Sequence, residues 1–156
     1  LVVYTYLGDR LHQDLRHELT HAMLHCVLKH VPIWLDEGLA EYFELPSNSQ
    51  GINVKHVEAL RDPSVRFDLD RLERLEEVHQ MSPAEYRESW AWVHLALRSS
   101  PQAKQALLSY LQELRTNPRP GPLRPRLASA FAAPEAAVQT HLADLERRHT
   151  KATAQR

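Results

Sequence analysis

Two histidines and a glutamate are spaced as in a metal-binding helix. The run HELTH at residues 17–21 has the form HExxH, and it lies in the segment 12–30, which holds five of the ten histidines. Residues four apart lie on one face of a helix, so His17 and His21 could occupy adjacent corners of a zinc tetrahedron. Glu18 lies about 100° further round the helix, where it could reach a water on the open side of the metal and act as general base.

A third ligand must come from another part of the chain. The segment WLDEGLAEY at residues 34–42 resembles the glutamate helix of gluzincins, the thermolysin-like and aminopeptidase-like zinc peptidases, and compact bacterial and archaeal members are most similar. The resemblance covers roughly residues 1–98 and implies that Glu37 completes a catalytic zinc site with an open fourth position. Metzincins would require a glycine and a histidine where this chain has Leu24 and Val27.

The resemblance leaves two registers open for this ligand. Glu37 holds the place before the glycine, and we favour it, whereas the spacing of thermolysin itself would select Glu41, one helical turn later. If Glu37 binds the metal, the resemblance implies that Glu41 accepts a hydrogen bond from His17 and that Asp36 steadies His21. Such carboxylates fix the tautomer and orientation of a metal-binding imidazole.

A donor to the developing oxyanion is expected from a downstream helix. The segment YRESWAWVH at residues 86–94 resembles the helix in which such peptidases place a tyrosine or a histidine for this purpose. Tyr86 is the first candidate and His94 the second, and two helical turns separate them. The competing interpretation is that Tyr86 is a half-buried core residue and His94 a capped or solvated one.

Hydrophobic periodicity and helix caps predict a mainly α-helical fold, which in terms of the resemblance is an α+β zincin-like remnant. Residues 1–6 (LVVYTY) predict one N-terminal edge strand, which needs a sheet partner from upstream or from another chain. The first helix carries an apolar stripe that includes Met23, Cys26 and Val27, and Cys26 is expected to be buried and inert. Helices are expected at 9–29, 33–45, 53–61, 68–78, 83–98, 101–115, 123–132 and 134–149.

The domain organisation follows from length and composition. A chain of 156 residues with 43% hydrophobic residues fits one core. We interpret 1–115 as a zincin-like catalytic domain, 116–125 (TNPRPGPLRP) as a Pro-rich connector, and 126–156 as C-terminal helices packed on the same domain. The chain opens without an initiator methionine or a recognisable signal, so we interpret it as a fragment or processed form.

Net charge and hydropathy argue against two classes of binding partner, nucleic acid and the membrane interior. A formal net charge of -1 predicts no binding to nucleic acid, and no apolar run reaches the roughly 20 residues of a membrane helix. The compartment stays open, although the resemblance to secreted and envelope-associated peptidases favours an extracytoplasmic location.

Three functions are compatible with these patterns. The favoured one is a Zn²⁺-dependent peptidase in which Glu18 activates water for attack on a peptide or protein substrate. The alternative is a catalytically inactive zinc-binding domain that acts as a binding or assembly module. The third is a helical interaction module without metal, for which the segment 116–125 and the amphipathic terminal helices would suit partner binding.

Overall fold

Helices form all the regular structure in the part of the chain that the computed structural model describes, residues 8–154. The prediction of a mainly α-helical fold is therefore confirmed, while the strand predicted at 1–6 lies outside the described residues. None of the described helices is long and apolar enough to cross a membrane. The elements in chain order are α1 (Leu11–Val27), α2 (Ile33–Phe43), η1 (Ser47–Ser49), α3 (Val54–Ala59), α4 (Leu69–Leu72), η2 (Val78–Gln80), α5 (Pro83–Arg98), α6 (Pro101–Leu114), α7 (Arg124–Leu127) and α8 (Pro134–Ala154).

Local sequence signals set the starts of the two longest central helices. Ser82 and Glu85 form a capping box at the start of α5, with Pro83 as its first residue. Ser100 caps α6, its hydroxyl accepting a hydrogen bond from the backbone of the first turn. Because these side chains satisfy N–H groups that a helix start leaves unpaired, they fix where α5 and α6 begin.

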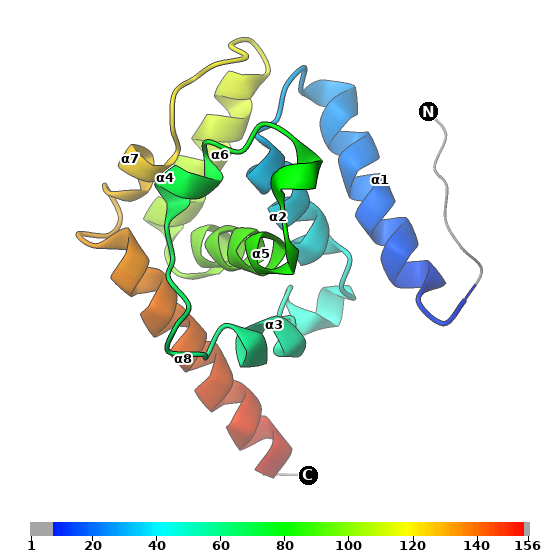
Figure 1. The fold of residues 1–156 in the computed structure, drawn as a ribbon, viewed down its shortest axis with the longest axis vertical. Helices are drawn as coiled ribbons and strands as arrows, with labels where there is room; N and C mark the ends of the chain where they lie inside the picture. The colour runs from blue at the N-terminus through cyan, green and yellow to red at the C-terminus, as the bar shows by residue number, and fades with distance from the viewer. Residues whose placement is uncertain (1–7, 155–156) are drawn as a thin grey trace.

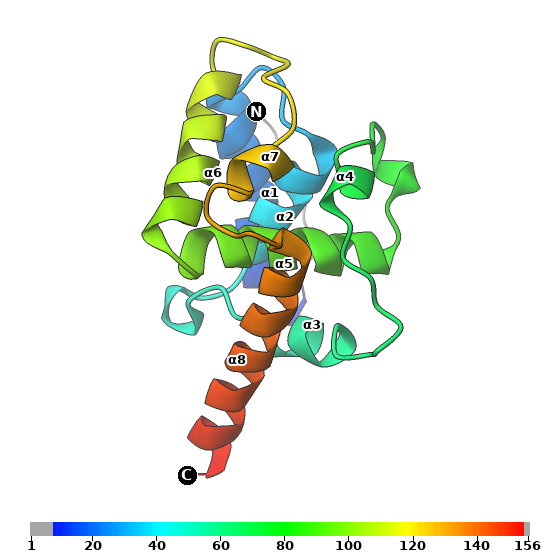
Figure 2. The same ribbon diagram turned by 90° about the vertical axis from the view of Figure 1, so that its left-hand side faces the viewer.

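Helix α5 runs through the centre of the molecule, and the other long helices surround it (Figure 1, Figure 2). Helix α2 packs along α5 on one side, α1 covers the outer side of α2, and α6 and α8 contact α5 from other directions. Trp34, Trp90 and Trp92 are almost fully buried. Leu127 and Val138 of the last two helices belong to the same hydrophobic core, so these helices close the core around α5.

Helices α2 and α5 approach each other closely at Gly38. A methyl group at this position would lie 2.7 Å from the backbone oxygen of Ser89 and 2.9 Å from a side-chain methyl of Val93. Such distances are well inside van der Waals contact, so only glycine permits this crossing. The glycine thus locks α2 on α5 next to Glu37, the predicted metal ligand.

The apolar stripe of α1 does not face the core, contrary to prediction. Leu19, Met23 and Val27 are 41%, 71% and 59% exposed, and Cys26 is exposed as well. Helix α1 packs mainly on α2 and presents its histidine face to that neighbour. These four residues of the stripe are therefore left uncovered by the other described elements, although Ala22 of the same stripe is buried, and the prediction of a buried Cys26 was wrong.

The charged helix predicted at 68–78 is shorter than expected. Its first turn forms α4, where the side chain of Asp68 accepts a hydrogen bond from the backbone N–H of Arg71 at 2.9 Å. Directly after this turn, the carboxylate of Glu73 accepts a hydrogen bond from the backbone N–H of Leu123. This tertiary contact ties the chain to the distant connector, and the helix ends there because tertiary structure overrides local propensity.

Candidate metal centre

Helices α1 and α2 bring two histidines and one carboxylate together. The Nε2 atoms of His17 and His21 lie 3.5 Å and 3.6 Å from Oε2 of Glu37. Donor atoms of these three residues all lie within 4.8 Å of one another, so the group could hold a metal ion. The i,i+4 spacing on α1 sets the two imidazoles side by side, with ring centroids 4.9 Å apart.

Each of these imidazoles is oriented by a second carboxylate. Nδ1 of His17 lies 3.0 Å from Oε2 of Glu44, and Nδ1 of His21 lies 2.9 Å from Oδ1 of Asp36. The amide of Gln13 also donates a hydrogen bond to Glu44 and holds that carboxylate in place. When a neutral imidazole donates its Nδ1 hydrogen to a carboxylate, the lone pair is on Nε2, which is the atom directed at Glu37.

The charges of the cluster shift its pKa values strongly. Burial opposes a positive charge on both histidines, but contacts with Glu37 and Glu44 raise the pKa of His17 to about 10. Contacts with Asp36 and Glu37 likewise raise the pKa of His21 to about 9 against the effect of burial. The two histidines in turn lower the pKa of Glu37 to about 2, although its burial acts in the opposite direction. Without a metal ion, the positive charges of the protonated imidazoles therefore balance the negative charges of the ionised carboxylates.

Glu44, rather than Glu41, contacts the first histidine, which corrects the predicted pairing. The carboxylate of Glu41 instead lies 2.8 Å from Nε2 of His56. Glu44 is seven residues after Glu37, two turns along the same face of α2, and it is 5% exposed. The sequence shows this spacing, but the predicted partner of His17 was Glu41, one helical turn before Glu44.

Tyr86 lies beside the carboxylates of the cluster. Burial, followed by the negative charges of Glu37 and Glu41, raises the pKa of its hydroxyl, so the group stays protonated at neutral pH. Its side chain is half-buried near the start of α5. Glu18 follows His17 on α1 and is exposed.

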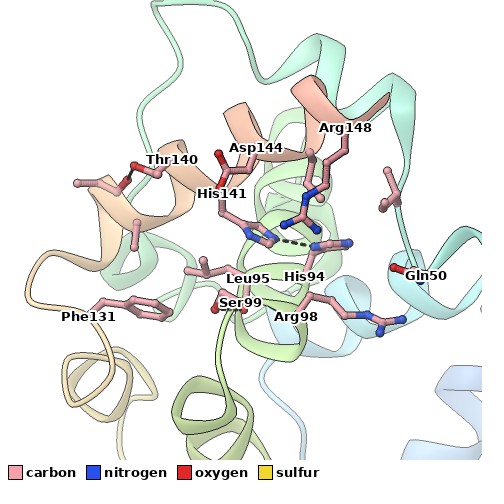
Figure 3. Close-up of a pocket in the computed structure, with 14 residues that line it drawn as sticks. Gln50, His94, Leu95, Arg98, Ser99, Phe131, Thr140, His141, Asp144 and Arg148 are labelled. Atoms are coloured by element: carbon pink, nitrogen blue, oxygen red, sulfur yellow. Dashed lines mark hydrogen bonds between the residues drawn. The ribbon is translucent and has the colours of Figure 1, made fainter. Parts of the chain in front are cut away.

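His94 lies elsewhere, and the structure does not bring it to the three donors. Its ring is 1% exposed and packs against Trp90 and Tyr42. Nδ1 of His94 lies 2.8 Å from Nε2 of His141, a residue of α8 (Figure 3). The 8-residue separation of Tyr86 and His94 turns the helix by about 80° relative to whole turns, which directs the two side chains to different neighbours. His94 is therefore removed from the candidate metal centre.

His25, two helical turns after His17, joins the network through Asp36. Asp36 bridges two imidazoles, because its Oδ2 lies 2.8 Å from Nε2 of His25 while its Oδ1 faces His21. His25 is half-exposed, so this second contact is open to solvent. Two further groups of possible metal ligands overlap the first. One consists of His21, His25 and Asp36, and the other of His17, Glu41 and Glu44.

Comparisons of the chain with known protein families, curated proteins and solved structures found no match. The site is therefore described from its own residues. In those terms it is a group of two imidazoles and one carboxylate, drawn from two packed helices, with carboxylates behind both rings. Such a group could hold a metal ion.

Proposed function

We propose that the protein is a zinc-dependent peptidase. The observation that carries the proposal is the convergence of His17, His21 and Glu37 from two helices, and the exposed Glu18 follows His17 in the chain. Three protein ligands leave a coordination position for water or substrate, which is typical of catalytic rather than structural zinc sites. The peptide substrate class rests on the resemblance of residues 17–21 and 34–42 to gluzincins.

The donor spacing supports zinc over metals that prefer an octahedral site. Ligand atoms about 2.1 Å from an ion are about 3.4 Å apart at tetrahedral angles and about 3.0 Å apart in an octahedron. The separations of 3.5 Å and 3.6 Å between the imidazole nitrogens and Glu37 are nearer the tetrahedral value. Two neutral imidazoles and one carboxylate also match the donor types that zinc accepts.

The proposed chemistry divides the work between the metal and the chain. Zinc, when bound, lowers the pKa of a coordinated water towards about 7 and polarises the scissile carbonyl. Glu18 accepts the proton of the attacking water and passes it to the leaving amine. Tyr86, protonated at neutral pH, donates a hydrogen bond to the developing oxyanion. Glu44 and Asp36 hold the two imidazoles with Nε2 directed at the metal.

The test is to separate metal binding from hydrolysis. Protein purified without chelators should contain about one zinc per chain by elemental analysis. Glu18→Gln should keep this zinc and reduce hydrolysis of a peptide library by about 10²- to 10⁴-fold, the usual contribution of a general base. Glu76→Gln, an exposed glutamate distant in sequence, is the matched control and should retain activity.

Each other outcome has a definite meaning. Protein that binds no zinc under these conditions contradicts the proposal outright. Zinc without turnover of any peptide in the library would favour the inactive binding or assembly module. Equal activity of Glu18→Gln and the unaltered protein would remove Glu18 as the base.

A further inference from the structure

A second polar site lies on the opposite side of α5 from the metal cluster. A cavity of about 550 Å³ opens between the second half of α5, the helix α8 and the turn at Gln50 (Figure 3). Its volume is in the range of small-molecule pockets, about 300–1,000 Å³. Leu95, Phe131 and Leu145 supply apolar walls, and the polar groups gather around the His94–His141 pair.

Two arginines flank this histidine pair without a carboxylate partner among the described residues. Arg98 donates a hydrogen bond from Nε to the hydroxyl of Tyr42 at 2.7 Å, a neutral acceptor. Arg148 forms no ion pair within the described part of the chain, and its guanidinium lies over the pair in Figure 3. Asp144, the one acidic residue of the lining, forms an ion pair with Arg147 outside it, and its charge also acts on His141.

The histidine pair offers hydrogen-bonding capacity that the protein itself does not use. Nδ1 of His94 contacts His141, while its Nε2 is buried and forms no hydrogen bond within the described residues. The backbone of Gln50 acts on the His94 ring and favours its charged form, but it makes no hydrogen bond of normal geometry to Nε2. An unpaired buried polar group costs about 1–3 kcal/mol. Such a group beside a cavity indicates a ligand that would complete its hydrogen bonding.

The turn at Gln50 is held in an unusual conformation at the rim of this cavity. Gln50 has φ 56°, the left-handed region that residues other than glycine rarely adopt. The next residue, Gly51, packs so closely on the ring of Tyr42 that a methyl group would lie 2.2 Å from it. Its carbonyl accepts a hydrogen bond from Nε1 of Trp90 at 2.9 Å. The rim is therefore fixed by the core rather than free to close the cavity.

We propose that this cavity binds a small oxyanion, a phosphate or carboxylate group on a compact apolar body. Arg98 and Arg148 would supply the opposing charges, and the imidazoles of His94 and His141 would supply directed hydrogen bonds. Guanidinium groups match the geometry of both oxyanions, and their positive charges repel one another while no anion is present. The bound anion would thus meet two guanidinium groups, while Asp144 is the one acidic side chain of the lining.

The test is anion binding by the full chain in the presence of a chelator, which removes any metal-bound anion. Inorganic phosphate and succinate are titrated separately by calorimetry, and the tighter ligand distinguishes the phosphate from the carboxylate source. We expect saturable binding, a rise in Tm with ligand concentration, and shifts of the imidazole nitrogen resonances of His94 and His141.

Variants locate the site. Arg148→Gln, an exposed position whose change leaves the core intact, should weaken binding at least tenfold. Arg10→Gln, whose side chain is 74% exposed at the start of α1, should not alter it, and neither should His17→Gln in the metal cluster. Absence of saturable binding by either ligand overturns the proposal. So does an unchanged affinity in Arg148→Gln, or a loss of binding in His17→Gln.

Discussion

The two histidine clusters of this protein show how environment sets the behaviour of one residue type. His17 and His21 lie between α1 and α2 with a carboxylate at each nitrogen, and their pKa values rise to about 10 and about 9. His94 lies between α5 and α8, where burial, His141 and Arg98 lower its pKa to about 3. The environment of the first cluster thus favours positively charged imidazoles or a bound cation, whereas that of the second favours neutral imidazoles.

This contrast shows that the number of histidines in a segment says little about its chemistry. His94 is almost fully buried and His17 and His21 are partly buried, so desolvation acts against the charged imidazole in both clusters. The difference lies in the partners, which are three carboxylates around His17 and His21, and a second imidazole with Arg98 nearby at His94. The first set of partners favours the charged imidazole and the second favours the neutral one.

The largest expected effect concerns the carboxylates behind the first cluster. Glu44→Gln should weaken zinc binding by about 10- to 100-fold, because a carboxylate that orients a metal-binding imidazole contributes about that much. Glu41→Gln, one turn earlier on the same helix, is the matched control and should leave the dissociation constant nearly unchanged. Competition with a chromophoric chelator measures both. A larger loss in Glu41→Gln would restore the pairing expected from sequence.

The next effect concerns the helix crossing that separates the two clusters. Gly38→Ala places a methyl group 2.7 Å from a backbone oxygen of α5 and should destabilise the protein by about 1–3 kcal/mol in urea unfolding. Gly8→Ala is the control, because a methyl group there would meet no atom within 4 Å. Since Gly38 adjoins Glu37, the first variant should also weaken zinc binding. Equal stability of the two variants would show that the crossing tolerates a side chain.

A further effect concerns the pH dependence of stability in chelator-treated protein. The raised pKa values of His17 and His21 contribute stability that is complete below pH 6.5 and is lost as pH rises towards 9–10. The lowered pKa of His94 has the opposite sign, because its neutral ring must be kept from protons that the unfolded chain binds below pH 6.5. The protein should therefore be most stable near pH 6.5, with a loss on either side.

Single variants assign each side of that profile. His17→Gln should reduce the loss of unfolding free energy between pH 6.5 and 9, and leave the acid side unchanged. His94→Gln should reduce the loss of unfolding free energy between pH 6.5 and about 4.5. Below this range Glu37 contributes as well, because the unfolded chain binds a proton at Glu37 near pH 4.5. Urea unfolding across this pH range measures both. If both variants flattened the same side, the assignment of opposite partners to the two clusters would be wrong.

Local signals were enough to predict much of the helical framework. The capping box at Ser82 and the proline at the start of α6 marked helices that the structure has within a residue of their expected ends. The segment 68–78 was predicted less well, because a hydrogen bond from Leu123 to Glu73 interrupts it. The hydrophobic periodicity of that segment contains no information about Leu123, which lies 50 residues further along the chain than Glu73.

The candidate site divides in the same way. The helical spacing of His17 and His21 is a local property that the sequence alone shows, whereas Glu37 was expected from the resemblance to gluzincins, with Glu41 as the other register. Glu44 was missed, because which turn of α2 meets His17 depends on how α1 lies across α2. The exposure of Cys26 has the same origin, since that packing decides which face of α1 is covered.

The sequence by itself determined the helices, their caps and the donor atoms that one helical face can present, because these depend on neighbours within a few residues. Only the tertiary structure decided that Glu44 stands behind His17, that His94 turns to His141, and that Arg148 is left without a carboxylate among the described residues. Each of these depends on the angle at which two helices cross. That angle is set by packing, as at Gly38, where the absence of a side chain permits the closest approach of α2 to α5.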